Sequence, residues 1–337
     1  MEWVTAALYE PAGDRLACTL CPVRCKLADG QVGACHVRRR TGDRLETRTF
    51  ATTVRHYDAV ERKPLYHFRP GSTVLTLAAP GCTFRCTYCV NHRISQYGRD
   101  DDVPWQAEPV DPAEVVELAA SRGASVALSY SEPSLAIELT LALAALGAGR
   151  GVGIIWKSNG FLTEEALALA APALAAVNID IKAADEERHH QLTGAPLAPV
   201  LASLRALHAR GVWVEVATPL IPGVSASPPD LARIAAIIAS VDPGIPWHLL
   251  RYTPAYRRSD DLPTLPDALA DGVRIGREAG LRYVYVERAL GPRGRETRCP
   301  ACGVTVVSRD LWALRELRLK DGACSRCGTA VEGRWDR

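Results

Sequence analysis

The chain has 337 residues, of which 47% are hydrophobic, and its 40 Lys and Arg residues nearly balance its 38 Asp and Glu residues. This length allows one sizeable core with small appendages, and the charge balance excludes a general electrostatic attraction to nucleic acid or to an anionic membrane. The first residues lack a basic start followed by an apolar run. We therefore expect a cytoplasmic protein with no membrane partner and no nucleic-acid partner.

Eleven cysteines fall into three groups along the chain. Cytosolic thiols are kept reduced, so clusters of this kind indicate metal ligands in preference to disulfides. The groups are Cys18, Cys21, Cys25 and Cys35; then Cys82, Cys86 and Cys89; and finally Cys299, Cys302, Cys324 and Cys327.

The first cysteine group lies in residues 1–62, which we predict to be a Cys-rich metal-binding segment. Its C-x2-C-x3-C-x9-C spacing suits either a structural zinc ion or an auxiliary [4Fe-4S] cluster. The ligand types alone do not separate the two. We favour the structural metal.

Residues 63–292 alternate between apolar, strand-like runs and amphipathic, helix-like runs. This alternation is typical of βα units around a parallel sheet and predicts an α/β fold, a partial (β/α)6 barrel with small Cys-rich appendages at both ends. Asp111 before Pro112, and Thr163 before two glutamates, predict helix N-caps. Strands are expected at 73–79, 125–130, 152–157, 176–181, 212–217, 246–251 and 281–286, and helices at 112–121, 135–146, 164–170, 200–209, 229–240 and 266–278.

The second cysteine group, C-x3-C-x2-C, follows the first predicted strand, at the edge where parallel α/β folds place their sites. Three thiolates can hold a cubane iron–sulfur cluster, which has four irons and therefore keeps one iron without a protein ligand. The alternative is a zinc site made by the same three cysteines and a histidine such as His92.

This loop resembles the signature of the radical S-adenosylmethionine (SAM) superfamily, in which an aromatic residue, here Tyr88, precedes the last cysteine. The resemblance implies a [4Fe-4S] cluster on Cys82, Cys86 and Cys89 whose open iron binds the amino and carboxylate groups of SAM. One electron then splits the sulfonium to give a 5′-deoxyadenosyl radical, which abstracts hydrogen from a substrate. It also implies an electron donor such as flavodoxin or ferredoxin.

Polar residues at the ends of later strands resemble the SAM-binding segments of the same superfamily. Glu132 is the expected acceptor for the SAM amino group, although the glycines of the family are replaced here by Tyr and Ser. Single polar residues at strand ends are commonly solvated or capping residues, and His248 on the sixth strand is either a core histidine or a site residue. The residues expected to bind the cofactor are Tyr88, Ser129, Tyr130, Glu132, Ser158, Asn159, Asp180, Lys182 and His248.

A closer resemblance covers nearly the whole chain. Residues 18–25, 33–38, 63–68 and 94–96, Asn91, and the closing C-x2-C pairs look like the AmmeMemoRadiSam-system radical SAM proteins, relatives of the pyruvate formate-lyase activating enzymes. Such proteins usually read Gln-Asn-Trp after the third cluster cysteine, whereas this chain reads Val90-Asn91-His92. The departure hints at a specialised substrate.

The chain is also similar to the cytosylglucuronate decarboxylases of blasticidin-type antibiotic pathways, which implies decarboxylation of a sugar-nucleoside acid. Arginine suits bidentate contact with a carboxylate, although arginines at the edge of a site are commonly solvent-exposed and bind no ligand. A small-molecule substrate is therefore the main expectation. The residues expected to contact it are Asn91, His92, Arg93, Arg251 and Tyr252, with Lys182 a further candidate for its carboxylate.

The third cysteine group has the two-knuckle pattern of a zinc ribbon, with Gly303 and Gly328 after the two pairs. Residues 293–337 are thus predicted to be a zinc-ribbon-like tail, which needs a metal because so short a segment cannot build its own core. Nucleic-acid recognition by this tail is the alternative.

Two other functions compete with the small-molecule radical SAM enzyme. One is an activase or modifying enzyme that acts on a protein or peptide, and the other is a non-enzymatic metal-binding or nucleic-acid-binding module. A macromolecular substrate requires a wide lateral opening, whereas a small acid requires an enclosed pocket with cationic groups.

Overall fold

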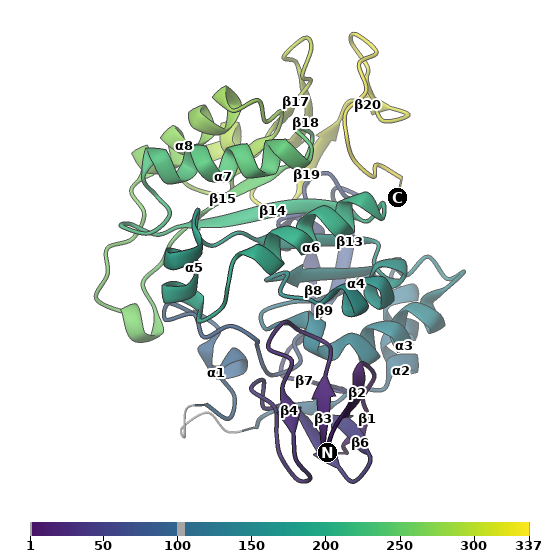
Figure 1. The fold of residues 1–337 in the computed structure, drawn as a ribbon. Coiled ribbons are helices and arrows are strands. Elements are labelled where there is room, and N and C mark those ends of the chain that lie inside the picture. Colours follow the sequence, from purple (N-terminus) through teal and green to yellow (C-terminus); the bar gives the residue numbers. More distant parts are fainter. Residues whose placement is uncertain (1, 100–104, 337) are drawn as a thin grey trace.

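The computed structural model describes residues 2–99 and 105–336. Its centre is one curved sheet of eight strands in the order β16-β15-β14-β13-β12-β11-β9-β8 (Figure 1). Seven strands run parallel, and β8 pairs antiparallel with β9 at one edge. The strands are β8 (Arg55–Ala59), β9 (Thr73–Leu77), β11 (Ser125–Leu128), β12 (Ile154–Ser158), β13 (Ala176–Asp180), β14 (Trp213–Leu220), β15 (Trp247–Arg251) and β16 (Val284–Val286).

The parallel strands form because both of their faces are covered. Every residue of β11 is buried, and seven of the eight residues of β14 are buried, which explains their continuous apolar runs. All seven predicted strands are present, and the expected partial barrel is confirmed.

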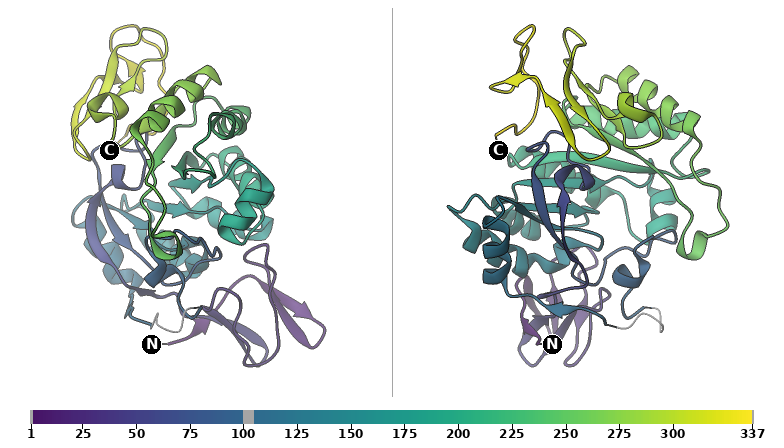
Figure 2. Two further views of the ribbon diagram at one scale, coloured as in Figure 1. Left: turned by 90° about the vertical axis from the view of Figure 1, so that its left-hand side faces the viewer. Right: turned by 180° about the vertical axis from the view of Figure 1, so that it is seen from behind.

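Helices lie along the outer side of the curved sheet (Figure 2, left). Neighbouring helices pack on one another, as α2 does on α3, α4 on α6 and α7 on α8. The helices are α1 (His92–Ser95), α2 (Pro112–Ala120), α3 (Ile137–Gly147), α4 (Glu164–Ala170), α5 (Glu186–Thr193), α6 (Ala198–Ala209), α7 (Pro228–Val241) and α8 (Pro266–Glu278).

Both predicted helix caps are confirmed. The Asp111 side chain accepts a hydrogen bond from the backbone N–H of Ala113, and Thr163 accepts one from that of Ala166. These bonds satisfy donors that the first turn of a helix leaves free. The expected helix at 135–146 instead starts with a 3-10 turn, Pro133–Ala136, before α3 begins at Ile137.

Helix α5 and strand β8 are among the elements that were not predicted. Helix α5 contains a single apolar residue, Leu192, so it has no hydrophobic periodicity to detect. Strand β8 is short and partly exposed at the sheet edge, and it lies before residue 62, the end of the predicted N-terminal segment.

Small sheets occupy the two ends of the molecule, with the N-terminal residues at one end and the yellow C-terminal tail at the other (Figure 2). The N-terminal strands are β1 (Val4–Thr5), β2 (Tyr9–Ala12), β3 (Arg15–Cys18), β4 (Lys26–Leu27), β5 (Arg38–Thr41), β6 (Arg44–Thr47) and β7 (Ala51–Thr52), which pairs with β10 (Glu108–Pro109). The C-terminal strands are β17 (Thr297–Arg298), β18 (Thr305–Arg309), β19 (Leu314–Leu317), β20 (Leu319–Lys320) and β21 (Ala323–Cys324). Short 3-10 turns occur at Val60–Arg62, Ala171–Ala173, Tyr256–Arg258 and Gly291–Gly294.

Candidate active site

A cavity of about 360 Å³ lies at the carboxyl ends of the parallel strands. Its wall comes from the loop after β9 and from the ends of β11, β12 and β13, which is where side chains from separate strands can meet. Twelve of the predicted site residues line it together: Cys82, Cys86, Tyr88, Cys89, Asn91, Ser129, Tyr130, Glu132, Ser158, Asn159, Asp180 and Lys182.

The loop that carries the three cysteines is fixed by side chains that follow it in the sequence. The Arg99 guanidinium donates hydrogen bonds to the carbonyls of Cys82 and Phe84, both at 2.7 Å. The Gln96 amide donates to the Phe84 carbonyl at 3.2 Å, and the Ser95 hydroxyl lies 3.2 Å from Cys89 Sγ. The positions of the thiols therefore do not depend on a bound cluster alone.

Burial affects the protonation of Cys82 and Cys86. It raises the pKa of Cys86 to about 12 and that of Cys82 well above its usual value. A thiol in this state becomes a thiolate ligand when a metal cation replaces its proton. The group is thus suited to binding a cationic iron centre.

The segment after β11 bends sharply into the cavity. Tyr130 has a φ of +69°, a left-handed conformation that costs free energy in a residue other than glycine. The Tyr130 hydroxyl lies 3.3 Å from Asp58 Oδ2 and 3.5 Å from Lys63 Nζ. These contacts hold the aromatic ring at the cavity wall.

Glu132 links the ends of β11 and β12. Its carboxylate accepts hydrogen bonds from the Ser158 hydroxyl at 2.7 Å and from the backbone N–H groups of Asn159 and Ser134 at 2.8 and 3.0 Å. Burial raises the pKa of Glu132 despite these donors. These contacts position Ser158 and Asn159, and because Oε2 accepts a single one of the three donors, the carboxylate keeps an acceptor site for a ligand.

Three charged groups meet at the ends of β12 and β13. The Asp180 carboxylate accepts hydrogen bonds from the ammonium groups of Lys157 and of Lys182, the latter at 2.8 Å. Burial acts to raise the pKa of Asp180, but the two ammonium groups outweigh it and hold that pKa at about 2. With both lysines protonated, the group carries a net charge of +1 and can attract a carboxylate. Lys182 also lies 5.8 Å from the centre of the Tyr88 ring.

Four residues expected to contact the substrate lie outside the cavity wall formed by the described residues. The His92 ring stacks on Tyr256 with the centroids 4.6 Å apart, and Arg93 and Arg251 are exposed. The Tyr252 hydroxyl donates to Asp261 at 2.8 Å, and its ring contacts Tyr88. Of the residues expected to contact the substrate, Asn91 and Lys182 line the cavity.

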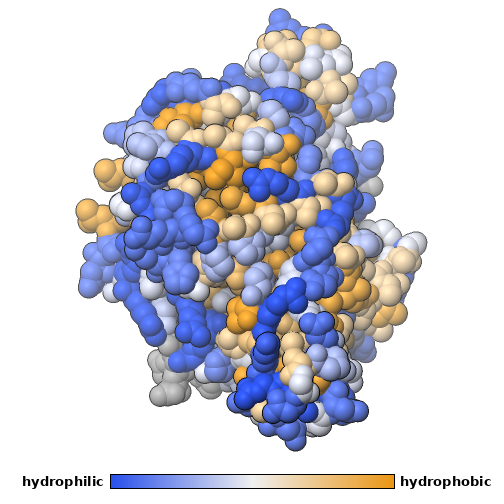
Figure 3. All heavy atoms as spheres, viewed as in Figure 1, coloured by the Kyte–Doolittle hydropathy of each residue, from blue (hydrophilic) through white to orange (hydrophobic). Residues whose placement is uncertain are grey.

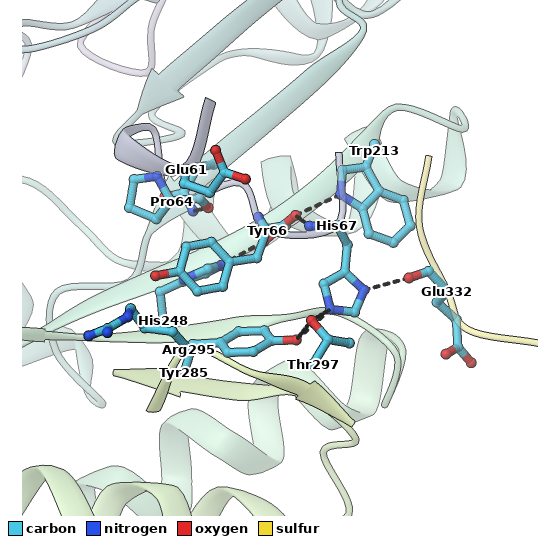
Figure 4. Close-up of polar contacts among 12 residues, drawn as sticks. Glu61, Pro64, Tyr66, His67, Trp213, His248, Tyr285, Arg295, Thr297 and Glu332 are labelled. Atoms are coloured by element: carbon cyan, nitrogen blue, oxygen red, sulfur yellow. Dashed lines mark hydrogen bonds and ion pairs between the residues drawn. The ribbon is translucent and has the colours of Figure 1, made fainter. Parts of the chain in front are cut away.

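His248 does not line this cavity either, and it belongs to a buried polar network (Figure 4). Its Nε2 is 2.6 Å from Glu215, whose carboxylate also accepts the backbone N–H groups of Tyr66 and His67 at 2.9 and 2.7 Å. His67 in turn bonds the Tyr285 hydroxyl. These contacts make His248 a core histidine and attach segment 63–68 to the sheet.

The sequence analysis missed Lys157, Arg99, Arg62 and Glu287. Lys157 could have been chosen, because it ends the third strand beside Ser158. Arg99 gave no signal, since its contacts are backbone carbonyls brought near it only by folding. Arg62 and Glu287 both line the cavity but come from opposite ends of the barrel sequence.

The two outer cysteine groups are also assembled. In the tail, Cys299 Sγ lies 3.5 Å from Cys327 Sγ, and Cys302 Sγ lies 3.8 Å from Cys324 Sγ. Four thiolates at 2.3 Å from a tetrahedral zinc ion would lie about 3.8 Å apart, so these distances fit that metal. The four N-terminal cysteines line a second cavity together with Thr83 and Arg99.

The chain is similar in sequence to several known proteins. The family model of the radical SAM superfamily matches residues 77–235. An uncharacterized protein of Methanocaldococcus jannaschii is 29% identical over 97% of this chain and 98% of its own length. The isethionate sulfite-lyase activating enzyme of Nitratidesulfovibrio vulgaris is 31% identical over 49% of this chain, and the benzylsuccinate synthase activating enzyme of Thauera aromatica is 30% identical over 36%.

The chain spans 53% and 39% of these two activating enzymes, respectively. A radical SAM methyltransferase from Sphaerobacter thermophilus shares the fold, with a TM-score of 0.50 and 18% identity over 66% of this chain and 68% of that one. None of the described helices is long and apolar enough to cross a membrane.

Proposed function

Because the family model of the radical SAM superfamily matches residues 77–235, we propose that the chain is a radical SAM enzyme in which Cys82, Cys86 and Cys89 hold a [4Fe-4S] cluster and SAM is cleaved reductively. The observation that carries this proposal is the meeting of these three thiols with the polar ends of β11, β12 and β13 around one cavity. When bound, the cluster supplies one electron to the sulfonium, and the resulting deoxyadenosyl radical abstracts hydrogen. The protein binds SAM, aims the radical and excludes water.

Different residues of the chain are suited to bind different parts of SAM. The net positive charge of Lys157, Asp180 and Lys182 suits the SAM carboxylate, and the Tyr88 ring offers an apolar surface for adenine. Ser158 and Asn159, held by Glu132, supply hydroxyl and amide groups for the ribose. The Asn159 amide also donates to Thr83 at 3.0 Å, which couples the SAM-binding end of β12 to the cysteine loop.

We propose further that the substrate is a protein or peptide. The relatives of known function are activating enzymes of isethionate sulfite-lyase and benzylsuccinate synthase. Val90, directly after the last cluster cysteine, lines the cavity and is 62% exposed. An exposed apolar residue at a cavity rim favours contact with an apolar partner surface.

The connection between β15 and α8 also contacts the cysteine loop. The Arg257 N–H donates to the Thr87 carbonyl at 3.0 Å, which holds the connection against the cysteine loop. Leu262 and Leu265 in the same connection are 77% and 69% exposed. Hydrophobic side chains project from the corresponding left-hand edge of the molecule in Figure 3.

Decarboxylation of a sugar-nucleoside acid such as cytosylglucuronate is the second candidate. The observation that favours it is the presence of three cationic side chains, Arg62, Lys157 and Lys182, in a cavity wall that also contains Glu132, Asp180 and Glu287. The cationic groups suit a small carboxylate, but Lys157 and Lys182 are also suited to the carboxylate of SAM itself. No relative named above has a decarboxylase name.

The SAM-cleavage assignment is tested with reconstituted, reduced protein. Wild type should form 5′-deoxyadenosine from SAM, and Cys82→Ala, Cys86→Ala and Cys89→Ala should each abolish this, because two thiolates do not retain a site-differentiated cubane. Cys327→Ala in the tail is the matched control and should keep the activity. Undiminished deoxyadenosine in all three loop variants would refute the assignment.

The substrate class is tested by deuterium transfer. Extracts of the source organism grown on deuterated medium are divided by ultrafiltration into a protein and a small-molecule fraction, and each is added to wild type with SAM and reductant. Deuterated deoxyadenosine from the protein fraction, lost after protease treatment, supports a protein substrate. Deuterium from the small-molecule fraction alone contradicts it, and carbon dioxide released from cytosylglucuronic acid would establish the second candidate.

A further inference from the structure

The N-terminal cysteines form a four-thiol site next to the cysteine loop of the barrel. Cys18, Cys21, Cys25 and Cys35 line one cavity, and its wall includes Thr83, the neighbour of Cys82. Burial raises the pKa of Cys21 to about 12 and also raises that of Cys35. The position connects this segment to the proposed SAM-cleaving cluster.

The spacing of the thiols separates this site from the zinc-like site in the tail. Among the residues that the structure describes, the tail cysteines are the only group of three or more possible ligands whose ligand atoms all lie within 4.8 Å of one another. A tetrahedral zinc ion requires sulfur atoms about 3.8 Å apart. The N-terminal four are spread more widely than such an ion requires.

The cysteines of the barrel loop provide an internal comparison. Cys82, Cys86 and Cys89 also fail to form a group within 4.8 Å. This is expected for a cubane, because each thiolate binds a different iron and the sulfur atoms are therefore farther apart than around a single ion. In their spacing, the N-terminal thiols resemble the loop thiols and differ from the tail thiols.

Two arginines give the N-terminal site a positive wall. Arg38 is 1% exposed; its guanidinium pairs with Glu138 and lies 3.9 Å from Cys18 Sγ. Arg99 is the second, and the Nε of each arginine is a buried donor with no hydrogen-bond partner among the described residues. Three other arginines also have such an Nε, namely Arg48, Arg295 and Arg309. Arg38 and Arg99 differ from them in position, because they line this site, and N–H groups commonly bond the sulfur atoms of iron–sulfur clusters.

We propose that Cys18, Cys21, Cys25 and Cys35 hold an auxiliary [4Fe-4S] cluster that passes single electrons to the cluster on Cys82, Cys86 and Cys89. This replaces the structural metal favoured from the sequence. Four thiolates ligate all four irons, so the cluster has no open iron for SAM or substrate and is suited to electron transfer. A small reducing protein of the flavodoxin or ferredoxin class supplies the electron.

Arg99 joins the two sites structurally. Its Nη2 donates to the Ala34 carbonyl at 2.9 Å and to the Cys82 carbonyl at 2.7 Å, so one side chain joins the residue before Cys35 to Cys82 itself. Oxidised and reduced states of the auxiliary cluster differ by one negative charge, and this buried cation stabilises the reduced state. The relay rests on the proposed SAM cleavage, whereas the identity of the cluster does not.

Metal analysis and Mössbauer spectroscopy of anaerobically reconstituted wild type test the cluster. We expect about eight irons and about one zinc per wild-type chain. The triple variant Cys82→Ala, Cys86→Ala, Cys89→Ala should keep about four irons, all in the auxiliary cluster. The EPR signal of this reduced cluster should not change when SAM is added. Cys302→Ala is the matched control and should keep both iron signals. About four irons and two zincs in wild type, with no iron in the triple variant, would overturn the proposal.

The relay is tested with Cys25→Ala, at a partly exposed ligand position, and with Cys35→Ala as a second variant. SAM cleavage driven by reduced flavodoxin should fall about tenfold or more, whereas cleavage driven by dithionite should change less than about twofold. Equal rates with flavodoxin in wild type and in variants that lack the auxiliary iron would overturn the relay. Failure of wild type to cleave SAM with dithionite would refute the proposed function and leave the iron count unaffected.

Discussion

Replacing Lys182 by methionine tests the charged group at the ends of β12 and β13. Methionine approximates the length of the lysine stem but removes the ammonium that lies 2.8 Å from Asp180. With Lys157 and Asp180 kept, the net charge of the group falls from +1 to zero. The affinity for SAM should therefore fall, because its carboxylate loses its cationic partner.

The magnitude follows from the contact that is lost. Lys182 is largely buried, with 12% of its side chain exposed, so its attraction to a bound carboxylate is only weakly screened by solvent. A hydrogen bond to a charged group is worth about 1.5–3 kcal/mol, which corresponds to an affinity loss of about 10- to 150-fold. Because Asp180 has a pKa of about 2, it stays ionised at neutral pH.

The assay is anaerobic calorimetric titration of the reconstituted protein with SAM. Asp180→Asn combined with Lys182→Met returns the group to a net charge of +1 through Lys157, so this double variant should bind SAM more tightly than Lys182→Met alone. Lys182→Arg retains the charge and is the conservative control. A dissociation constant for Lys182→Met within about twofold of wild type would refute the role given to this charge.

Three further predictions concern stability. Burial lowers the pKa of His67 to about 3. As the pH falls below about 6.5, the unfolded chain therefore binds a proton that the folded chain excludes. The free energy of unfolding should then fall by about 1.4 kcal/mol per pH unit. In urea unfolding, the free energy of unfolding of His67→Gln should decrease less with falling pH than that of wild type. Equal pH dependences in the two proteins would count against this reasoning. Glu215→Gln changes an acceptor shared by four donors and should lower the free energy of unfolding by about 2–4 kcal/mol. Glu278→Gln, at an exposed ion pair, should lower it by less than about 0.5 kcal/mol. Similar urea midpoints for the two variants would contradict the role of the network. Cys299→Ser should release the tail metal and make residues 293–337 sensitive to protease, while intact metal content would argue against the zinc site.

The amino-acid sequence by itself determined the parts of this protein that local pattern controls. Buried parallel strands are apolar along their whole length, so all seven appeared as continuous runs, and the caps Asp111 and Thr163 were identified from residue type and position. The loop spacing of Cys82, Cys86 and Cys89 identified the cavity wall because the ligands lie within eight residues of one another.

Tertiary structure alone decided which distant groups meet. His248 and Glu215 are 33 residues apart, and the Tyr66 N–H that shares this carboxylate is 149 residues from it, so no local pattern could tell a core histidine from a site histidine. Arg99 bonds carbonyl groups that any residue would provide, and its position depends on how the loop closes. The spacing of the N-terminal thiols is likewise a three-dimensional quantity: C-x2-C-x3-C-x9-C permits zinc or a cubane, and folding sets the distances that separate them.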